Sequence, residues 1–140
     1  MPSVSGLSHI DLTVSNAQRS AAWYREALGM LQVYETESPD MFPGHQINMF
    51  DPASGLILGM IQHERAEPGA FSELRVGLDH LSLAVQSRDD LEAWAEHFDR
   101  VGVEHSGITD MSYGSVLVFR DPDRIQLELA LLTVAPPEPA

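Results

Sequence analysis

Two stretches of the sequence are nearly alike: GLSHIDLTV at residues 6–14 and GLDHLSLAV at residues 77–85. Each places a histidine, His9 or His80, at the head of a segment in which apolar and polar residues alternate. Alternation with a period of two is typical of a β-strand that has one buried face. The same histidine-bearing strand is therefore predicted twice, which indicates an internal duplication.

The spacing of other residues extends this duplication through most of the chain. Trp23 and Trp94 are separated by the same 71 positions as the two histidines, and Asp51 and Asp121, each followed by proline, are separated by 70. We therefore expect a single domain over residues 1–140 that is made of two modules. The modules are expected at about residues 5–65 and 76–134, with ERAEPGAFSELR as the connector and residues 135–140 as a flexible tail.

Each module has the same predicted order of elements, a strand followed by a helix and then by three strands. The helices are expected at residues 16–29 and 87–102, where Gly29 and Gly102 end them and Ser87 is an N-cap for the second. The residues expected on the buried side of the first helix are Ala22, Trp23 and Leu28. Those of the second helix are Leu91, Trp94 and Phe98. The predicted fold class is α+β, with two tandem β-α-β-β-β modules forming curved mixed sheets around a metal or ligand cavity.

The alternation also predicts which way the polar side chains point. In the first strand, Ile10 and Leu12 share one face and His9 shares the other with Asp11. Since the helix of each module covers the apolar face, the histidines and Glu128 in the last strand should lie on helix-distal faces. The sheets would then bring His9, His80 and Glu128 together if they curve round a shared hollow.

Two imidazoles and one carboxylate form a ligand set for a divalent metal. The same residues also have an alternative interpretation that involves no metal. A histidine on a strand is often only a hydrogen-bonded polar residue, and Glu128 is one of 21 acidic residues in the chain. One ancestral residue also accounts for both His9 and His80.

The composition excludes several classes of function. The chain has 140 residues, no cysteine and no lysine, so disulfides, thiolate catalysis and lysine Schiff bases are ruled out. Its net charge of −13 would repel a phosphate backbone, so no nucleic-acid partner is expected. No apolar run has the length of a membrane span, and the start MPSVSG has no features of a secretory signal. A cytoplasmic protein is therefore expected.

The segments HIDLTV, HLSLAV and DPDRIQLEL, set in duplicated modules, resemble the glyoxalase/bleomycin-resistance/extradiol-dioxygenase superfamily, also called vicinal oxygen chelate proteins. The resemblance covers about residues 6–132. It implies metal ligands from the first and last strands of each module, that is, His9, His80 and Glu128. The fourth ligand would fall near Leu58 or Gly59, neither of which can bind a metal through its side chain.

The chain thus departs from the four-ligand pattern of glyoxalase I and methylmalonyl-CoA epimerase. It keeps the three-ligand pattern of extradiol dioxygenases and fosfomycin-resistance transferases. Three protein ligands leave positions for a substrate that binds through two adjacent oxygens. The metal expected from the resemblance is divalent zinc, iron, manganese, nickel or cobalt.

Further candidates come from the same comparison. His63 is a candidate catalytic base, or else an exposed histidine at a strand end, and Tyr113 is a candidate proton donor, or else a turn residue. Ring-cleaving relatives need a tyrosine where this chain has Val118, which counts against ring cleavage. Arg124 could hold a substrate carboxylate, or else be a solvated turn residue. Two histidines are expected at the surface: His45 and His105.

These predictions lead to two hypotheses for function. The first is a metal-dependent enzyme acting on a small oxygenated substrate by bidentate chelation, with lyase or isomerase chemistry favoured and dioxygenase chemistry as the other possibility. The second is a protein similar to bleomycin-resistance proteins, which sequesters a cationic, drug-like ligand in an acidic cleft without catalysis. Both predict a small-molecule partner, no membrane contact and a homodimer.

Overall fold

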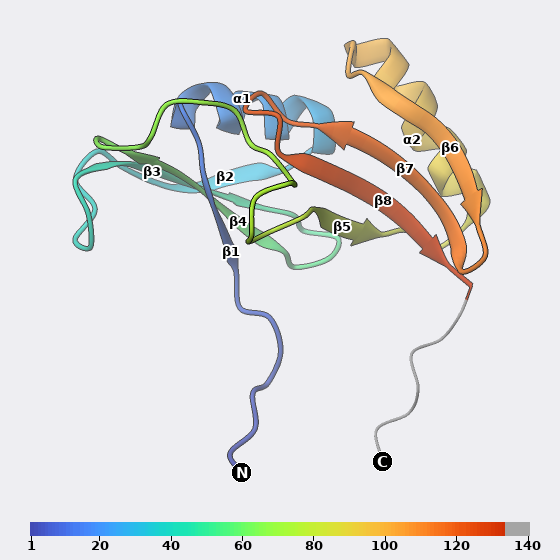
Figure 1. The fold of residues 1–140 in the computed structure, drawn as a ribbon, viewed down its shortest axis with the longest axis horizontal. Coiled ribbons are helices and arrows are strands. Elements are labelled where there is room, and N and C mark those ends of the chain that lie inside the picture. Colours follow the sequence, from blue (N-terminus) through green and yellow to red (C-terminus); the bar gives the residue numbers. More distant parts are fainter. Residues whose placement is uncertain (134–140) are drawn as a thin grey trace. The chain divides into compact units, whose positions relative to one another are not determined.

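The computed structural model describes residues 1–133. They belong to two compact units, and the second unit begins after Gly69 (Figure 1). The flexible tail expected at residues 135–140 lies outside the described residues. Within the described residues, the helices are too short and too polar to cross a membrane.

The N-terminal unit contains one helix and a four-stranded mixed sheet. Its elements are β1 (Ile10–Thr13), α1 (Ala17–Leu28), β2 (Leu31–Thr36), β3 (Gly44–Phe50) and β4 (Ile57–His63). The strand order is β1-β4-β3-β2, with β1 parallel to β4 and the other neighbours antiparallel. The helix α1 packs on β2, β3 and β4.

The C-terminal unit repeats this arrangement. Its elements are β5 (Leu81–Ala84), α2 (Arg88–Val101), β6 (His105–Met111), β7 (Gly114–Arg120) and β8 (Gln126–Leu132). The strand order is β5-β8-β7-β6, with only β5 and β8 parallel, and α2 packs on β6, β7 and β8. The predicted α+β fold, with two tandem β-α-β-β-β modules, is confirmed.

The alternating patterns in the sequence decide which face of each sheet the helix covers. Leu12 and Val14 of the first strand segment are buried, while Asp11 and Thr13 between them are exposed. In β8, Leu127 and Leu129 are buried in the same way. Burying each of these side chains contributes on the order of 2 kcal/mol to stability. The polar positions of both terminal strands are therefore left on the helix-distal face, as the alternation predicts.

The ends of both helices are fixed by local hydrogen bonds. The Asn16 side chain accepts from the Arg19 N–H at the start of α1, and the Ser87 hydroxyl accepts from the Asp90 N–H at the start of α2. Gly29 and Gly102 end the two helices in the left-handed conformation, as predicted.

The predicted buried side of α1 is wrong. Ala22 is exposed, and Trp23 is only half-buried. The helix instead turns a set of small residues and one tyrosine toward the sheet: Ala17, Ser20, Ala21, Tyr24 and Ala27. Small side chains carry little hydrophobic signal, so the sequence pattern points to the wrong stripe. In α2, Leu91 and Phe98 are buried as predicted and Trp94 is half-buried.

The connector between the modules is held at its C-terminal end. The Phe71 N–H donates to the Asp123 carbonyl oxygen at 2.9 Å. The Arg120 guanidinium donates to both carboxylate oxygens of Glu73, at 2.8 and 3.3 Å, and to the Arg124 carbonyl oxygen at 2.9 Å. Residues 66–70, which precede these contacts, are exposed.

Candidate metal site

A histidine and a glutamate are brought together on two adjacent strands of the C-terminal unit. Parallel pairing of β5 with β8 places Ser82 directly beside Glu128. The Ser82 hydroxyl donates to Glu128 Oε1 at 2.7 Å, and His80 Nε2 lies 3.9 Å from the same oxygen. On the other side of the ring, His80 Nδ1 lies 2.6 Å from Asp79 Oδ1.

This geometry fits the binding of a divalent metal. The Asp79 carboxylate accepts a hydrogen bond from Nδ1, which leaves the lone pair of His80 Nε2 free to bind a cation. The 3.9 Å between Nε2 and Oε1 is too long for a hydrogen bond. Two donors bound at 2.0–2.2 Å to one ion are separated by roughly 3–3.5 Å, so a small side-chain rotation would suffice.

The N-terminal unit contains a second pair of the same kind. His9 Nδ1 lies 3.1 Å from the Ser8 hydroxyl, and His9 Nε2 lies 3.8 Å from Asp11 Oδ2. Both side chains of the pair are open to solvent, with exposed fractions of 55% for His9 and 44% for Asp11. Each module thus holds its histidine by Nδ1 and turns Nε2 toward a carboxylate.

The structure brings together two of the three predicted metal ligands, His80 and Glu128. His9 belongs to the other unit, and its binding to the same metal as His80 and Glu128 stays a prediction. In the part of the chain that the structure describes, no three histidine, aspartate or glutamate side chains are close enough to form a metal site. Sequence reasoning did not anticipate Asp79 and Ser82, although Asp79 directly precedes the histidine in the repeated stretch.

His63 lies on β4, near the end of the strand. It is four residues beyond Gly59 on the same face, which separates the two positions by roughly 13 Å along the strand. Its ring lies against Phe42, with 4.5 Å between the ring centroids. Its role as a catalytic base stays a prediction.

Tyr113 lies in the turn between β6 and β7 and is 44% exposed. Across the β7–β8 ladder, Val118 is the residue that pairs with Glu128. Tyr113 is five residues before Val118, so it lies roughly 16 Å along the strand from the level of Glu128. Its role as a proton donor also stays a prediction.

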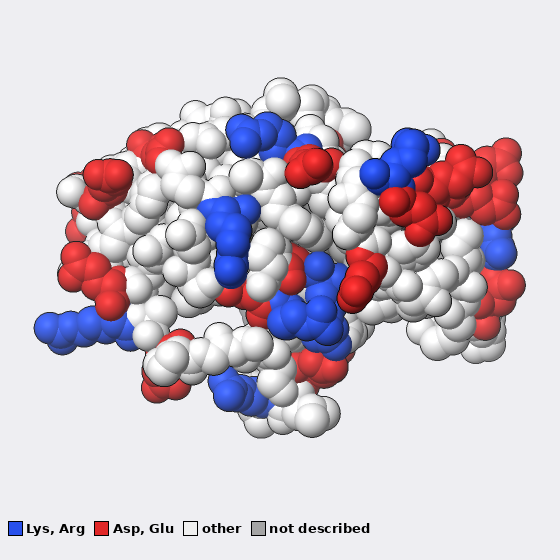
Figure 2. Space-filling model, turned by 90° about the horizontal axis from the view of Figure 1, so that it is seen from above, with Lys and Arg blue, Asp and Glu red and all other residues white. Residues whose placement is uncertain are grey.

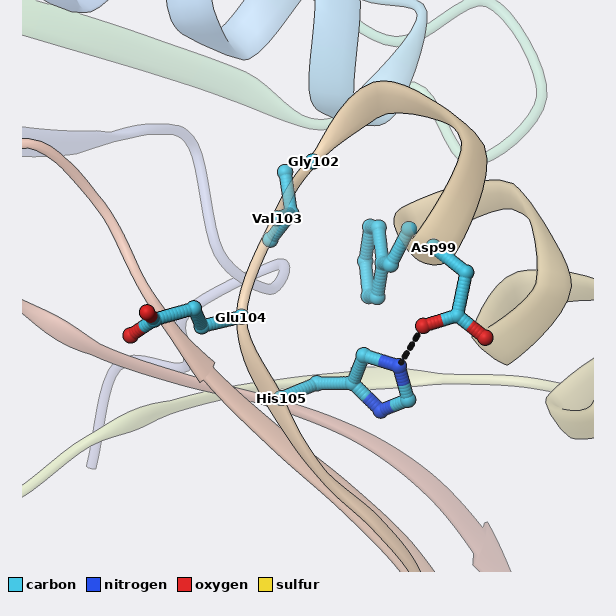
Figure 3. Close-up of a pocket in the computed structure, with 6 residues that line it drawn as sticks. Asp99, Gly102, Val103, Glu104 and His105 are labelled. Atoms are coloured by element: carbon cyan, nitrogen blue, oxygen red, sulfur yellow. Dashed lines mark hydrogen bonds and ion pairs between the residues drawn. The ribbon is translucent and has the colours of Figure 1, made fainter.

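A shallow cavity of about 530 Å³ lies at the end of α2, next to His105 (Figure 3). The Gly107 N–H donates to His105 Nδ1, and His105 Nε2 lies 3.1 Å from Asp99 Oδ1. His105 pairs with Phe119, and Phe119 pairs with Leu127, so this cavity opens on the helix-covered side of the sheet. Glu128 is on the other side, and the cavity is therefore separate from the candidate metal pair.

His45 and His105, which were expected at the surface, are only partly exposed. Their side chains are only 16% and 12% exposed. His45 Nε2 lies 2.9 Å from Glu35 Oε1, and His105 is held by Asp99, so both serve as polar links between neighbouring elements. Each is paired with a carboxylate, which makes them useful controls for the candidate metal pair.

The negative charge is distributed over both units, and acidic side chains occupy several separate places on the face seen in Figure 2. Hydrogen bonds from Arg120 hold the pKa of Glu73 below its usual range. Hydrogen bonds from the Ser115 hydroxyl and the Arg88 guanidinium do the same for the pKa of Asp110. The N-terminal unit also has a hollow of about 440 Å³ with an acidic rim that includes Glu37, Asp40 and Glu64.

Comparison with known proteins agrees with this architecture. Residues 6–129 match the family model described as the Glyoxalase/Bleomycin resistance protein/Dioxygenase superfamily. The chain belongs to this superfamily. A solved glyoxylase/bleomycin resistance protein/dioxygenase domain from Frankia sp. EAN1pec is 33% identical, with a TM-score of 0.82 over 93% of this chain and 99% of that one.

Two further relatives differ more in sequence. The Bacillus subtilis (strain 168) protein named "Putative ring-cleaving dioxygenase MhqA" is 25% identical over 128 residues, which are 90% of this chain and 40% of that protein. The chain therefore spans less than half the length of this curated relative. A glutamate-to-glutamine mutant of the fosfomycin resistance protein FosX from Listeria monocytogenes, solved with Mn(II) and 1S,2S-dihydroxypropylphosphonic acid, is 20% identical. It has a TM-score of 0.68 over 94% of each chain, which shows a shared fold.

Proposed function

We propose that this protein is a divalent-metal enzyme acting on a small substrate that presents two adjacent oxygen atoms. The observation that carries the proposal is the pair formed by His80 and Glu128, with Nε2 and Oε1 3.9 Å apart on the helix-distal face. His9 is proposed as the ligand that the N-terminal module contributes. A bound divalent metal would polarise a substrate oxygen and stabilise the negative charge that develops on it during the reaction.

The residues around this pair have distinct parts in the proposal. Asp79 accepts a hydrogen bond from Nδ1 of His80, which would leave Nε2 available to hold the cation. Ser82 donates to one oxygen of Glu128 and so holds the carboxylate in place across the two strands. These contacts orient both ligands before a metal arrives, which lowers the entropy cost of binding it.

Among the possible reactions, lyase or isomerase chemistry is favoured over ring cleavage. The resemblance implies a tyrosine in ring-cleaving enzymes at the position of Val118, and Val118 pairs directly with Glu128. An apolar side chain therefore lies beside the ligand where a proton donor would be needed. The name of the Bacillus subtilis relative supports the dioxygenase alternative, for which a catechol substrate under oxygen is the direct assay.

Glu128→Gln tests the proposal. The amide keeps the shape of the side chain but is a poorer ligand for a divalent cation than a carboxylate. We expect affinity for Mn(II), measured by calorimetric titration of untagged protein, to fall about tenfold or more. Asp99→Asn is the matched control, because it also removes a carboxylate paired with a histidine but lies on the helix-covered side, and it should leave the affinity unchanged.

A second candidate function, binding without catalysis, is favoured by the acidic hollow of the N-terminal unit. Its rim combines Glu37, Asp40 and Glu64 with the apolar side chains of Met41 and Phe42, which suits a cationic, partly apolar ligand. If the wild type binds no divalent metal and instead binds bleomycin with an affinity that falls as salt rises, this second function is right and the first is wrong.

A further inference from the structure

In each module the first and last strands pair in parallel, and one of the two carries a carboxylate. The strand that carries it differs between the modules. In the C-terminal unit, Ser82 of β5 pairs with Glu128 of β8. In the N-terminal unit, Asp11 of β1 pairs with Gly59 of β4 at the same level. Each pair has one acidic residue, but it belongs to the last strand in one module and to the first strand in the other.

The Asp11 side chain occupies the space that a side chain at residue 59 would need. A Cβ atom built on Gly59 would lie 2.1 Å from Asp11 Oδ1, which is far inside van der Waals contact. The neighbouring Asn48 oxygen would be 3.4 Å away and would leave room. The glycine therefore opens a place on β4, and a carboxylate from β1 fills it.

Asp11 also stands in the same relation to His9 as Glu128 does to His80. The distance from His9 Nε2 to Asp11 Oδ2 is 3.8 Å, and the corresponding distance in the C-terminal unit is 3.9 Å. In both modules Nδ1 is held by the residue just before the histidine, Ser8 or Asp79. Both modules thus place a histidine nitrogen and a carboxylate oxygen at nearly the same distance from each other on the helix-distal face. The carboxylate comes from the first strand in one module and from the last strand in the other.

We propose that Asp11 is a metal-binding carboxylate, which replaces on β1 the ligand that Gly59 cannot provide on β4. The inference rests on the proposed function, since it concerns the same divalent metal. It changes the expected ligand set from three side chains to four: His9, Asp11, His80 and Glu128. With Asp11 bound, fewer positions remain for substrate and water, and one more negative charge offsets that of the cation.

The experiment exchanges the carboxylate between the two strands. Asp11→Ser alone should lower the affinity for Mn(II) about tenfold or more, measured by calorimetric titration. The double variant Asp11→Ser/Gly59→Glu recreates the pairing of Ser82 with Glu128, and it should restore the affinity to within about threefold of the wild type. The visible spectrum of the Co(II)-loaded protein gives a second readout, because it reports the number and kind of ligands.

Two further variants keep the test decisive if the double variant does not fold. Asp11→Asn has nearly the same shape as the wild-type side chain and should weaken Mn(II) binding as much as Asp11→Ser. Glu26→Gln removes a negative charge from the exposed side of α1 in the same module, and it should have no effect. Melting curves followed by circular dichroism show which variants remain folded.

The outcomes separate this inference from the proposed function. Weakened Mn(II) binding in both Asp11 variants, with rescue where the double variant folds, supports Asp11 as a ligand. If Asp11→Asn binds Mn(II) like the wild type while Glu128→Gln binds it weakly, Asp11 is not a ligand and the proposed function stands. If the wild type binds no Mn(II), Zn(II), Ni(II), Co(II) or Fe(II), both proposals are wrong.

Discussion

The helices α1 and α2 occupy the same place in their modules but fill it with different residues. Ser20 of α1 is the counterpart of Leu91 of α2, and both are fully buried. The large buried aromatic residue is Tyr24 in the first helix and Phe98, about one helical turn further along, in the second. The duplication has thus retained caps, strand order and register, while each core has been repacked with a different arrangement of large and small side chains.

The largest expected effect comes from truncating the two counterparts Leu91 and Ser20. Leu91→Ala should lower the free energy of unfolding by about 3 kcal/mol, because it leaves a cavity under α2. Ser20→Ala should instead raise it by about 1 kcal/mol, because the buried Ser20 hydroxyl has no hydrogen-bond partner among the described residues and alanine favours the helix. Urea denaturation of each variant measures both values. A destabilising Ser20→Ala would show that the hydroxyl is bonded, and the contrast between the helices would be lost.

A smaller effect is expected in the turns before β4 and β8, where one residue adopts the left-handed conformation. In the first turn this residue is Gly55, with φ of 78°, and in the second it is Arg124, with φ of 69°. Such a backbone costs a non-glycine residue about 1 kcal/mol. Arg124→Gly should therefore stabilise the protein by up to about 1 kcal/mol, and Gly55→Ala should destabilise it by a similar amount.

Activity measurements on Arg124→Gly address the other role predicted for this residue. If Arg124 holds a substrate carboxylate, the variant will be more stable but will have a raised KM with little change in kcat. An unchanged KM would leave Arg124 as a turn residue only. Thermal melting and steady-state kinetics on the same preparation distinguish these results.

The smallest effect concerns the contact between the start of each helix and its sheet. The Ala17 N–H at the start of α1 donates to Gln62 Oε1 at 2.9 Å, whereas Arg88 at the start of α2 binds the Asp110 carboxylate of β6. Gln62→Ala should therefore cost about 1 kcal/mol at any pH between 4 and 8.

Asp110→Asn should act differently, because its contribution depends on charge. Asp110 has a lowered pKa in the folded protein, so its ion pair stabilises the fold above the ordinary aspartate pKa of about 4 and loses this effect as the pH falls through the lower folded value. We expect Asp110→Asn to melt slightly below the wild type at pH 7 and to differ less from it at pH 3. A difference in melting temperature that is the same at both pH values would contradict this account.

Much of the fold was readable from the sequence, because local signals determined it. Alternation gave the strand faces, Ser87 and the two helix-ending glycines gave the helix limits, and the repeat gave the order of elements. The buried side of α1 was not readable, because Trp23 and Tyr24 are adjacent and only packing decides which of them turns inward. The pairing of Asp11 with Gly59 was not readable either, since parallel register is set by tertiary contacts between distant segments.

The hydrogen bonds of Phe71 and Glu73 determine where this chain can be divided or can accept an insertion. They attach the end of the connector to the C-terminal module, and the Ala66 N–H donates to the His63 carbonyl oxygen at the other end, so the stretch between these anchors is the exposed run Glu67 to Ala70. An engineer who wished to insert a reporter domain, or to express the two modules as separate polypeptides, would cut within this run, which includes the midpoint of the connector. An insertion in this run leaves the hydrogen bonds of both modules in place.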